Sequence, residues 1–230
     1  MLAAAGWGAL VASSLVLGAL LALARRWDDR TIGIVLSFGA GALISAVSFE
    51  LAQEGVEVGG PGAVGVGLAV GAITYFLCDR PIERRPDAGG SALALGALLD
   101  GIPEQLVLGI GLAAGNGVSV GLVVAVFVSN LPEGIGSASD MLAAGRSRGY
   151  IVRLWCGVAA ICALATIAGY AIADVTGDTL EGIVNGFAAG ALLVMLADSM
   201  VPEARGKAGL GAGLALALGF AVAAAISGVS

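Results

Sequence analysis

The chain has 230 residues, of which 58% are hydrophobic and only 12% are charged, and its formal net charge at pH 7 is −6. Soluble domains carry about 25% charged residues, so this composition excludes a water-soluble globular protein. The acidic balance, without any basic tract, argues against a nucleic-acid partner, and the chain contains no histidine.

Eight stretches are long and apolar enough to cross a bilayer, which takes about 20 mainly apolar residues. In chain order, the predicted spans are 3–24, 31–53, 58–78, 91–114, 117–143, 150–173, 179–201 and 208–229. The connections are short, so we expect an all-α polytopic membrane protein with a single transmembrane domain over residues 1–230. No charged segment precedes the first apolar run, and a cleaved secretory signal is therefore not expected.

The basic residues fix an orientation, because all eleven Lys and Arg fall in alternate connections. They are Arg25, Arg26 and Arg30 after the first span, Arg80, Arg84 and Arg85 after the third, Arg146, Arg148 and Arg153 after the fifth, and Arg205 and Lys207 after the seventh. The positive-inside rule then predicts a multi-pass protein of the cell membrane with both termini extracytoplasmic.

The second and seventh spans resemble each other. Phe38-Gly39-Ala40-Gly41-Ala42-Leu43 recurs as Phe187-Ala188-Ala189-Gly190-Ala191-Leu192, an offset of 149 that also pairs Glu54 with Glu203. The topology gives the two spans opposite directions, which indicates an inverted repeat of the kind found in transporters. The alternative is that Gly/Ala/Leu-rich helices resemble each other by chance.

Two related runs lie near the middle of neighbouring spans. Asp100-Gly101-Ile102-Pro103-Glu104 is in the fourth span, and Ser129-Asn130-Leu131-Pro132-Glu133 is in the fifth. A carboxylate at this depth costs about 2.5–3.5 kcal/mol on insertion scales, and ionisable residues there are usually functional. Each proline also disturbs the carbonyl four residues earlier, which belongs to Leu99 or Val128.

Together these oxygen atoms describe a cation site, because no Lys or Arg lies deep in any predicted span. The candidate ligands are Asp100, Glu104, Ser129, Asn130 and Glu133. Without a bound cation, at least one of the crowded carboxyl groups should hold a proton, so metal entry would release protons. The alternatives are a permanently protonated carboxyl and a purely structural pair of proline kinks.

The paired runs resemble the motifs of the ZIP (Zrt/Irt-like protein) family of divalent metal transporters. That family has His-Asn-x-Pro-Glu-Gly in its fourth span and x-x-x-Pro-Glu-Gly in its fifth. Pro103-Glu104 and Pro132-Glu133-Gly134 match, whereas Asp100 falls where the histidine is expected and Gln105 replaces the glycine. The resemblance implies eight spans with both termini outside and inverted three-helix repeats flanking a central antiparallel pair. It also implies transport of a divalent metal, most often zinc, toward the cytoplasm.

The chain departs from the family pattern at the metal ligands. It lacks the usual histidines and the His-rich loop, and Ala160 falls near the position of a sixth-span glutamate that bridges a second metal in some bacterial members. We therefore expect one bound ion. Carboxylate and carbonyl ligands suit hard ions such as Mn²⁺ as well as zinc, so Mn²⁺, Fe²⁺ and Cd²⁺ stay open as substrates.

Polar residues nearer the ends of the spans are candidates for the ion pathway. The pathway candidates are Glu50 and Glu54 toward the outer side and Ser137, Asp140, Asp198 and Glu203 toward the cytoplasm. The alternative for each acid is a solvated helix end. Ser45 and Ser48 either line the route or bond backbone carbonyls, which is the commoner use.

Other functions stay open at this point. Within transport, the alternatives to a divalent transition metal are another hard cation or protons alone. Outside transport, the alternative is a membrane metal-binding or sensor protein that does not transport. An enzyme is not expected, because there is no HExxH, no histidine base and no nucleophile dyad. Cys78, Cys156 and Cys162 have no metal-site spacing and are interpreted as packing residues. The faces rich in Gly and Ala are compatible with a homodimer.

Overall fold

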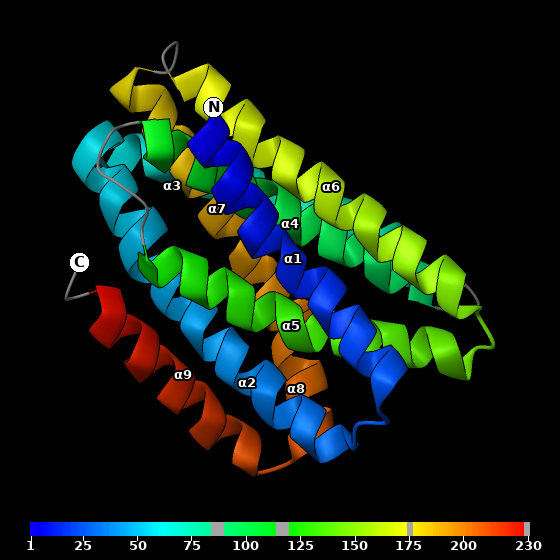
Figure 1. The fold of residues 1–230 in the computed structure, drawn as a ribbon. Coiled ribbons are helices and arrows are strands. Elements are labelled where there is room, and N and C mark those ends of the chain that lie inside the picture. Colours follow the sequence, from blue (N-terminus) through cyan, green and yellow to red (C-terminus); the bar gives the residue numbers. More distant parts are fainter. Residues whose placement is uncertain (84–89, 114–119, 174–176, 228–230) are drawn as a thin grey trace.

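The computed structural model describes residues 1–83, 90–113, 120–173 and 177–227, without the side chains of residues 81–83, 90–97, 99 and 100. Within these ranges the chain forms helices and no strand (Figure 1). The helices are α1 (Leu2–Ala24), α2 (Asp29–Ala46), α3 (Glu54–Glu83), α4 (Gly90–Ala113), α5 (Val120–Ala143), α6 (Arg148–Ile172), α7 (Asp178–Met195), α8 (Val201–Ala208) and α9 (Gly211–Ser227). Two π-helical segments, η1 (Val47–Gln53) and η4 (Leu196–Met200), join α2 to α3 and α7 to α8.

Two boundaries differ from the sequence prediction. Helix α2 continues through η1 into the start of α3, and this continuous helix breaks at Gly60. The φ angle of Gly60 is 81°, a value that favours glycine. The predicted connection after residue 53 is therefore helical, and the turn falls at Gly60. The predicted seventh span, which corresponds to α7, does not end at residue 201. It continues through η4 and α8 to Ala208. Lys207 thus lies on a helix rather than in a loop.

Five segments of the described chain are long and apolar enough to cross a membrane. They are Leu2–Ala24, Asp29–Arg80, Val120–Ala143, Arg148–Ile172 and Asp178–Ala208, while Gly101–Ala113 and Gly211–Ser227 are shorter apolar helices. The chain is thus an all-helical, multi-pass membrane protein. The count of eight spans and the inverted repeats stay predictions.

Helix α5 belongs to both hydrophobic clusters of the bundle, as α1 and α2 also do. One cluster joins it to α2 and α7 through residues such as Leu43, Val126 and Leu192. The other joins it to α1 and α6 around Trp155, which is fully buried. Large apolar side chains of α1, α3 and α9, including Leu20, Ile73 and Leu214, instead point outward, as expected for lipid-facing surfaces.

Glycines allow the helices to approach closely, which is typical of membrane bundles. At the contact between α1 and α5, a Cβ added to Gly134 would lie 2.6 Å from the Leu15 carbonyl oxygen. At the contact between α2 and α5, one added to Gly39 would lie 2.8 Å from Ser129 Cα. Further long contacts pair α3 with α7, α2 with α9 and α4 with α6.

Of the three cysteines, only Cys162 is buried; Cys78 and Cys156 are exposed on the outer surface of the helices. The predicted packing role therefore applies to Cys162 alone.

Candidate metal site

One face of α5 carries a row of polar residues toward α2. Ser129 lies against Gly39, and Gly136 lies near Ile32, whose Cγ2 is 3.9 Å from the position of an added Cβ. Residues 129, 133, 136 and 140 recur every three or four positions and so share this helix face. The two helices run antiparallel here, since the later residue of α5 meets the earlier residue of α2. The predicted ligands on α5 therefore lie at a helix contact inside the bundle.

The two predicted ligands beside Pro132 are buried. Ser129 and Asn130 are 2% and 5% exposed. The Ser129 hydroxyl donates a hydrogen bond to the Val126 carbonyl oxygen at 3.0 Å, so its proton is used within the helix. The lone pairs of its oxygen are the part that a cation would bind.

Glu104 on α4 is buried to 2% exposure, and it is the one acidic side chain in the described ranges that is fully buried. Glu133 on α5 is partly buried. An ionised carboxylate in a water-poor interior needs a positive partner or a proton, and neither α4 nor α5 contains a Lys or Arg. A metal ion is one such positive partner.

The structure describes the side chains of only some of the predicted ligands. Asp100 is on α4, but its side chain lies outside the described residues. Within the described part of the chain, no three Asp, Glu, Cys or His side chains come close enough to hold a metal ion. A site built from Asp100, Glu104 and Glu133 together therefore stays a prediction.

A polar pair beside Glu104 was missed by sequence reasoning. Gln105 is 1% exposed and its Oε1 accepts a hydrogen bond from the hydroxyl of Thr166 on α6, which is fully buried. The Nε2 atom of Gln105 has no hydrogen-bond partner among the described residues. The only available signal was the replacement of the family's glycine by glutamine. The polar surroundings of the site thus extend from α4 to α6.

At one end of the bundle, which we call the Glu54 end, acidic residues from several helices come together. Glu50, Glu57 and Glu181 are the charged groups that act on Glu54, and Gln53 donates a hydrogen bond to Glu57 at 3.0 Å. Glu50 Oε1 would lie 2.7 Å from a Cβ added to Gly121, near the start of α5. The two predicted outer residues, Glu50 and Glu54, are therefore close together.

The opposite end, which we call the Lys207 end, gathers the later residues of α5. The charges of Lys207, Glu203 and Asp29 act on Asp140. Ser137, one turn before Asp140, is 4% exposed, and its hydroxyl has no hydrogen-bond partner among the described residues. Three of the four predicted inner residues, Ser137, Asp140 and Glu203, thus lie at this end.

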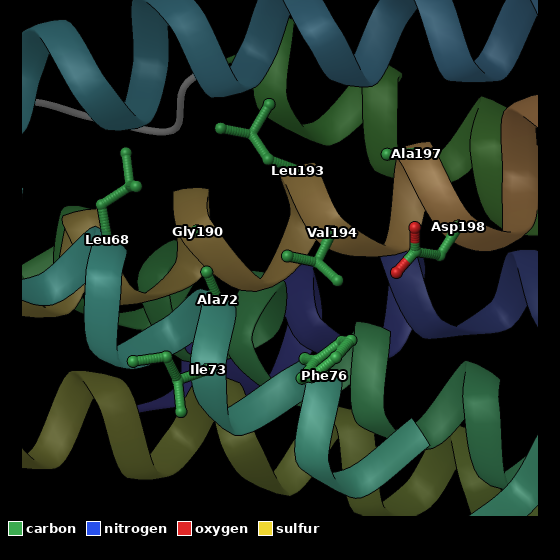
Figure 2. A pocket seen from close by; sticks show the side chains of 9 residues that line it. All are labelled: Leu68, Ala72, Ile73, Phe76, Gly190, Leu193, Val194, Ala197 and Asp198. Carbon is green, nitrogen blue, oxygen red and sulfur yellow. The ribbon is translucent and has the colours of Figure 1, made fainter. Parts of the chain in front are cut away.

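Asp198 has a different setting. It lies at one end of an open, mostly apolar pocket of about 400 Å³ (Figure 2). The pocket lies between α3 and the continuous helix of α7 and η4. The pocket is lined by Leu68, Ala72, Ile73, Phe76, Gly190, Leu193, Val194, Ala197 and Asp198. Asp198 thus faces α3, whereas the row on α5 faces α2.

Ser45 of α2 and Ser48 of η1 differ in their hydrogen bonds. The Ser48 hydroxyl donates to the Ile44 carbonyl oxygen at 2.8 Å, so the backbone-bonding alternative describes it. Ser45 is fully buried, and its hydroxyl has no hydrogen-bond partner in the described part of the chain.

Fold and composition define a multi-pass helical membrane protein with buried acid and amide groups at its centre. The sequence is similar to an Arabidopsis thaliana protein described as a putative zinc transporter, with 29% identity over 191 residues. The match covers 77% of this chain but only 30% of that protein's length. No family model matches the chain. The similarity is consistent with the resemblance to the ZIP family in the paired Pro-Glu motifs.

Proposed function

We propose that the chain is a ZIP-like secondary transporter that moves a divalent metal cation toward the cytoplasm, with zinc as the first candidate. The observation that carries the proposal is the complete burial of Glu104 on a helix without basic residues, in a chain similar to a zinc transporter. A buried carboxylate is costly unless a cation or a proton compensates its charge. A transported metal ion provides that charge only while it is bound.

The proposed ion site combines Asp100 and Glu104 of α4 with Ser129, Asn130 and Glu133 of α5. All of these side chains offer oxygen atoms, which bind Zn²⁺, Mn²⁺, Fe²⁺ and Cd²⁺ without the preference for zinc that imidazole gives. One ion is proposed. A hard cation or protons as substrate, or binding without transport, are the competing functions.

The proposed inverted repeats join α1 to α3 and α6 to α9, with α4 and α5 between them. The π-helical segments support this arrangement, since η1 begins at Val47 and η4 at Leu196, 149 residues apart. This offset equals the one between the similar runs that start at Phe38 and Phe187. Irregular turns at matching positions of two halves are expected of transporter repeats.

Helix packing supports the same pairing of α2 with α7. A Cβ added to Gly41 of α2 would meet the backbone of α9 at Leu216, and one added to Gly190 of α7 would meet the backbone of α3 at Leu68. Gly219 of α9 likewise packs on Phe38, and Gly71 of α3 packs on Phe187. The contacts of α2 with α9 and of α7 with α3 therefore use equivalent residues.

The proposed orientation places the Lys207 end in the cytoplasm and the Glu54 end outside, by the positive-inside rule. Both termini would then be extracytoplasmic. The proposed route enters near Glu50 and Glu54, passes the site on α4 and α5, and leaves by Ser137, Asp140 and Glu203. The outward-facing apolar side chains contact lipid; association into a homodimer through Gly/Ala faces is a further expectation.

Uptake into proteoliposomes tests the proposal. Zn²⁺, Mn²⁺ and Cd²⁺ uptake should be lost in Glu104→Gln and in Glu133→Gln. Asp178→Asn removes one exposed carboxylate at the start of α7 and should transport like the wild type. Normal uptake by both glutamine variants would refute the central site. Metal binding by the wild type without flux would favour the sensor function.

A further inference from the structure

The one lysine of the chain is partly buried against the bundle, and its carboxylate partner Glu203 is 40% exposed. Lys207 is 21% exposed, and its Nζ lies 2.7 Å from Glu203 Oε1. Its helix, α8, packs tightly on α2, because a Cβ added to Gly33 would lie 2.7 Å from Lys207 Cβ. The lysine side chain thus packs against α2 and has a defined carboxylate partner.

The ammonium and its carboxylate partner lie over α5. A Cβ added to Gly136 would lie 3.6 Å from Lys207 Nζ and 3.7 Å from Glu203 Oε1. Gly136 follows Glu133 by three residues, a rise of roughly 4.5 Å along the helix. It precedes Asp140 by about one turn on the same face. An ion that moves along this face from Glu133 to Asp140 would therefore pass the Lys207 ammonium.

The Lys207 ammonium lies near acidic groups at this end of the bundle. Glu203 is the carboxylate partner of Lys207, and Lys207, Glu203 and Asp29 are the charged groups that act on Asp140. The buried Ser137 hydroxyl, without a hydrogen-bond partner among the described residues, is on the same stretch of α5. An amine with one positive charge thus pairs with Glu203 and acts on Asp140, so it takes a place beside these two carboxylates that a divalent ion would otherwise take.

We propose that Lys207 is a resident cation that keeps divalent ions out of the Asp140–Glu203 end of the route until the Lys207–Glu203 pair moves aside. The proposal rests on the proposed transport function, since it assigns the inner end of that route. The positive charge of Lys207 repels a divalent cation that passes Gly136, and this repulsion is stronger where water is scarce. Lys207 is therefore a positioning residue for ion exit and not a ligand.

The two partners of the ion pair should have opposite effects on metal binding. Without the ammonium, Asp140 and Glu203 become available to a divalent ion. Without the Glu203 charge, the ammonium is no longer neutralised and repels the ion more strongly. A purely structural ion pair would give neither a gain of affinity nor this reversal of sign between its two members.

Equilibrium Mn²⁺ binding to the purified full chain in detergent tests the proposal. Lys207→Met should tighten Mn²⁺ binding by at least about tenfold, and this gain should persist when Glu133→Gln is added. Glu203→Gln should weaken binding instead. Arg205→Met removes the same charge from an exposed position two residues away and is the matched control. Thermal unfolding of each variant reports folding, and Glu203→Gln supplies an independent test if Lys207→Met does not fold.

Unchanged Mn²⁺ affinity in Lys207→Met would overturn the proposal, as would an equal gain in Arg205→Met, which would indicate a general charge effect. Tighter binding in Glu203→Gln would also overturn it. Wild-type uptake into proteoliposomes distinguishes a failure of the proposed transport function from a failure of the proposed role of Lys207. A wild type that moves no metal refutes the transport function, whereas active wild type with unaltered binding in Lys207→Met refutes only the role of Lys207.

Discussion

Gly134→Ala tests how closely α1 and α5 approach. The added Cβ would lie 2.6 Å from the Leu15 carbonyl oxygen, 3.2 Å from Gly18 Cα and 3.3 Å from the Ala19 nitrogen. All three are backbone atoms, so no side chain can rotate away and the helices themselves must separate. Inserting volume into a packed interior costs about 1–3 kcal/mol. For a chain of this size, each kcal/mol lowers the Tm by roughly 2–4 °C.

The assay is thermal unfolding in detergent, followed by the circular dichroism of the helices. Gly136→Ala on the same helix is the matched control, because its Cβ would meet only side-chain atoms at 3.6–3.9 Å, which is ordinary contact. We expect a clear fall in Tm for Gly134→Ala and little change for Gly136→Ala. Equal Tm values for Gly134→Ala and wild type would show that α1 and α5 are not in close contact at this point.

Two further predictions concern hydrogen bonds. Thr166→Val should cost about 1–3 kcal/mol, because it leaves the buried Gln105 without its donor, and the double variant with Gln105→Leu should regain part of the Tm. Hydrogen bonds from the backbone N–H and hydroxyl of Thr31 lower the pKa of Asp28 at the start of α2. Its stabilising effect is thus present above the unfolded-state pKa and lost as pH falls through the folded-state pKa. Asp28→Ala should lower the Tm more at pH 7 than at pH 2.5, and an equal fall at both pH values would contradict this role of the carboxylate.

Composition and hydropathy predicted most of the helix positions, because an apolar run of this length leaves the backbone no other way to satisfy its hydrogen bonds in lipid. The boundaries failed where charge was interpreted as a connection. Glu54 and Glu57 follow the predicted second span, yet the chain stays helical to Gly60. Partial burial of Glu54 beside Glu181 of α7 is a tertiary effect that hydropathy does not detect.

The site was predictable in part for a similar reason. A Pro-Glu pair inside an apolar helix signals a functional carboxylate, and Glu104 is buried as that signal suggests. The bond between Gln105 and Thr166 joins residues 61 positions apart, and it depends on the register of α4 against α6. The sequence alone indicates Lys207 only as a cytoplasmic charge, because its partial burial requires α8 to continue the helix of α7 and η4 and to pack on Gly33.

Helix α5 combines a closely packed face and a polar face, and this combination would suit the exchange of ion access that the proposed transport requires. Toward α1 it packs backbone against backbone at Gly134 and Leu15, a contact that leaves little freedom to slide. Toward α2 it presents Ser129, Glu133 and Gly136, and there the inner part is covered by side chains rather than backbone. Side chains change rotamer far more readily than packed helices move apart. In the proposed route, opening at the Lys207 end would therefore need only movement of the Lys207–Glu203 pair, with α1 and α5 kept together as one unit.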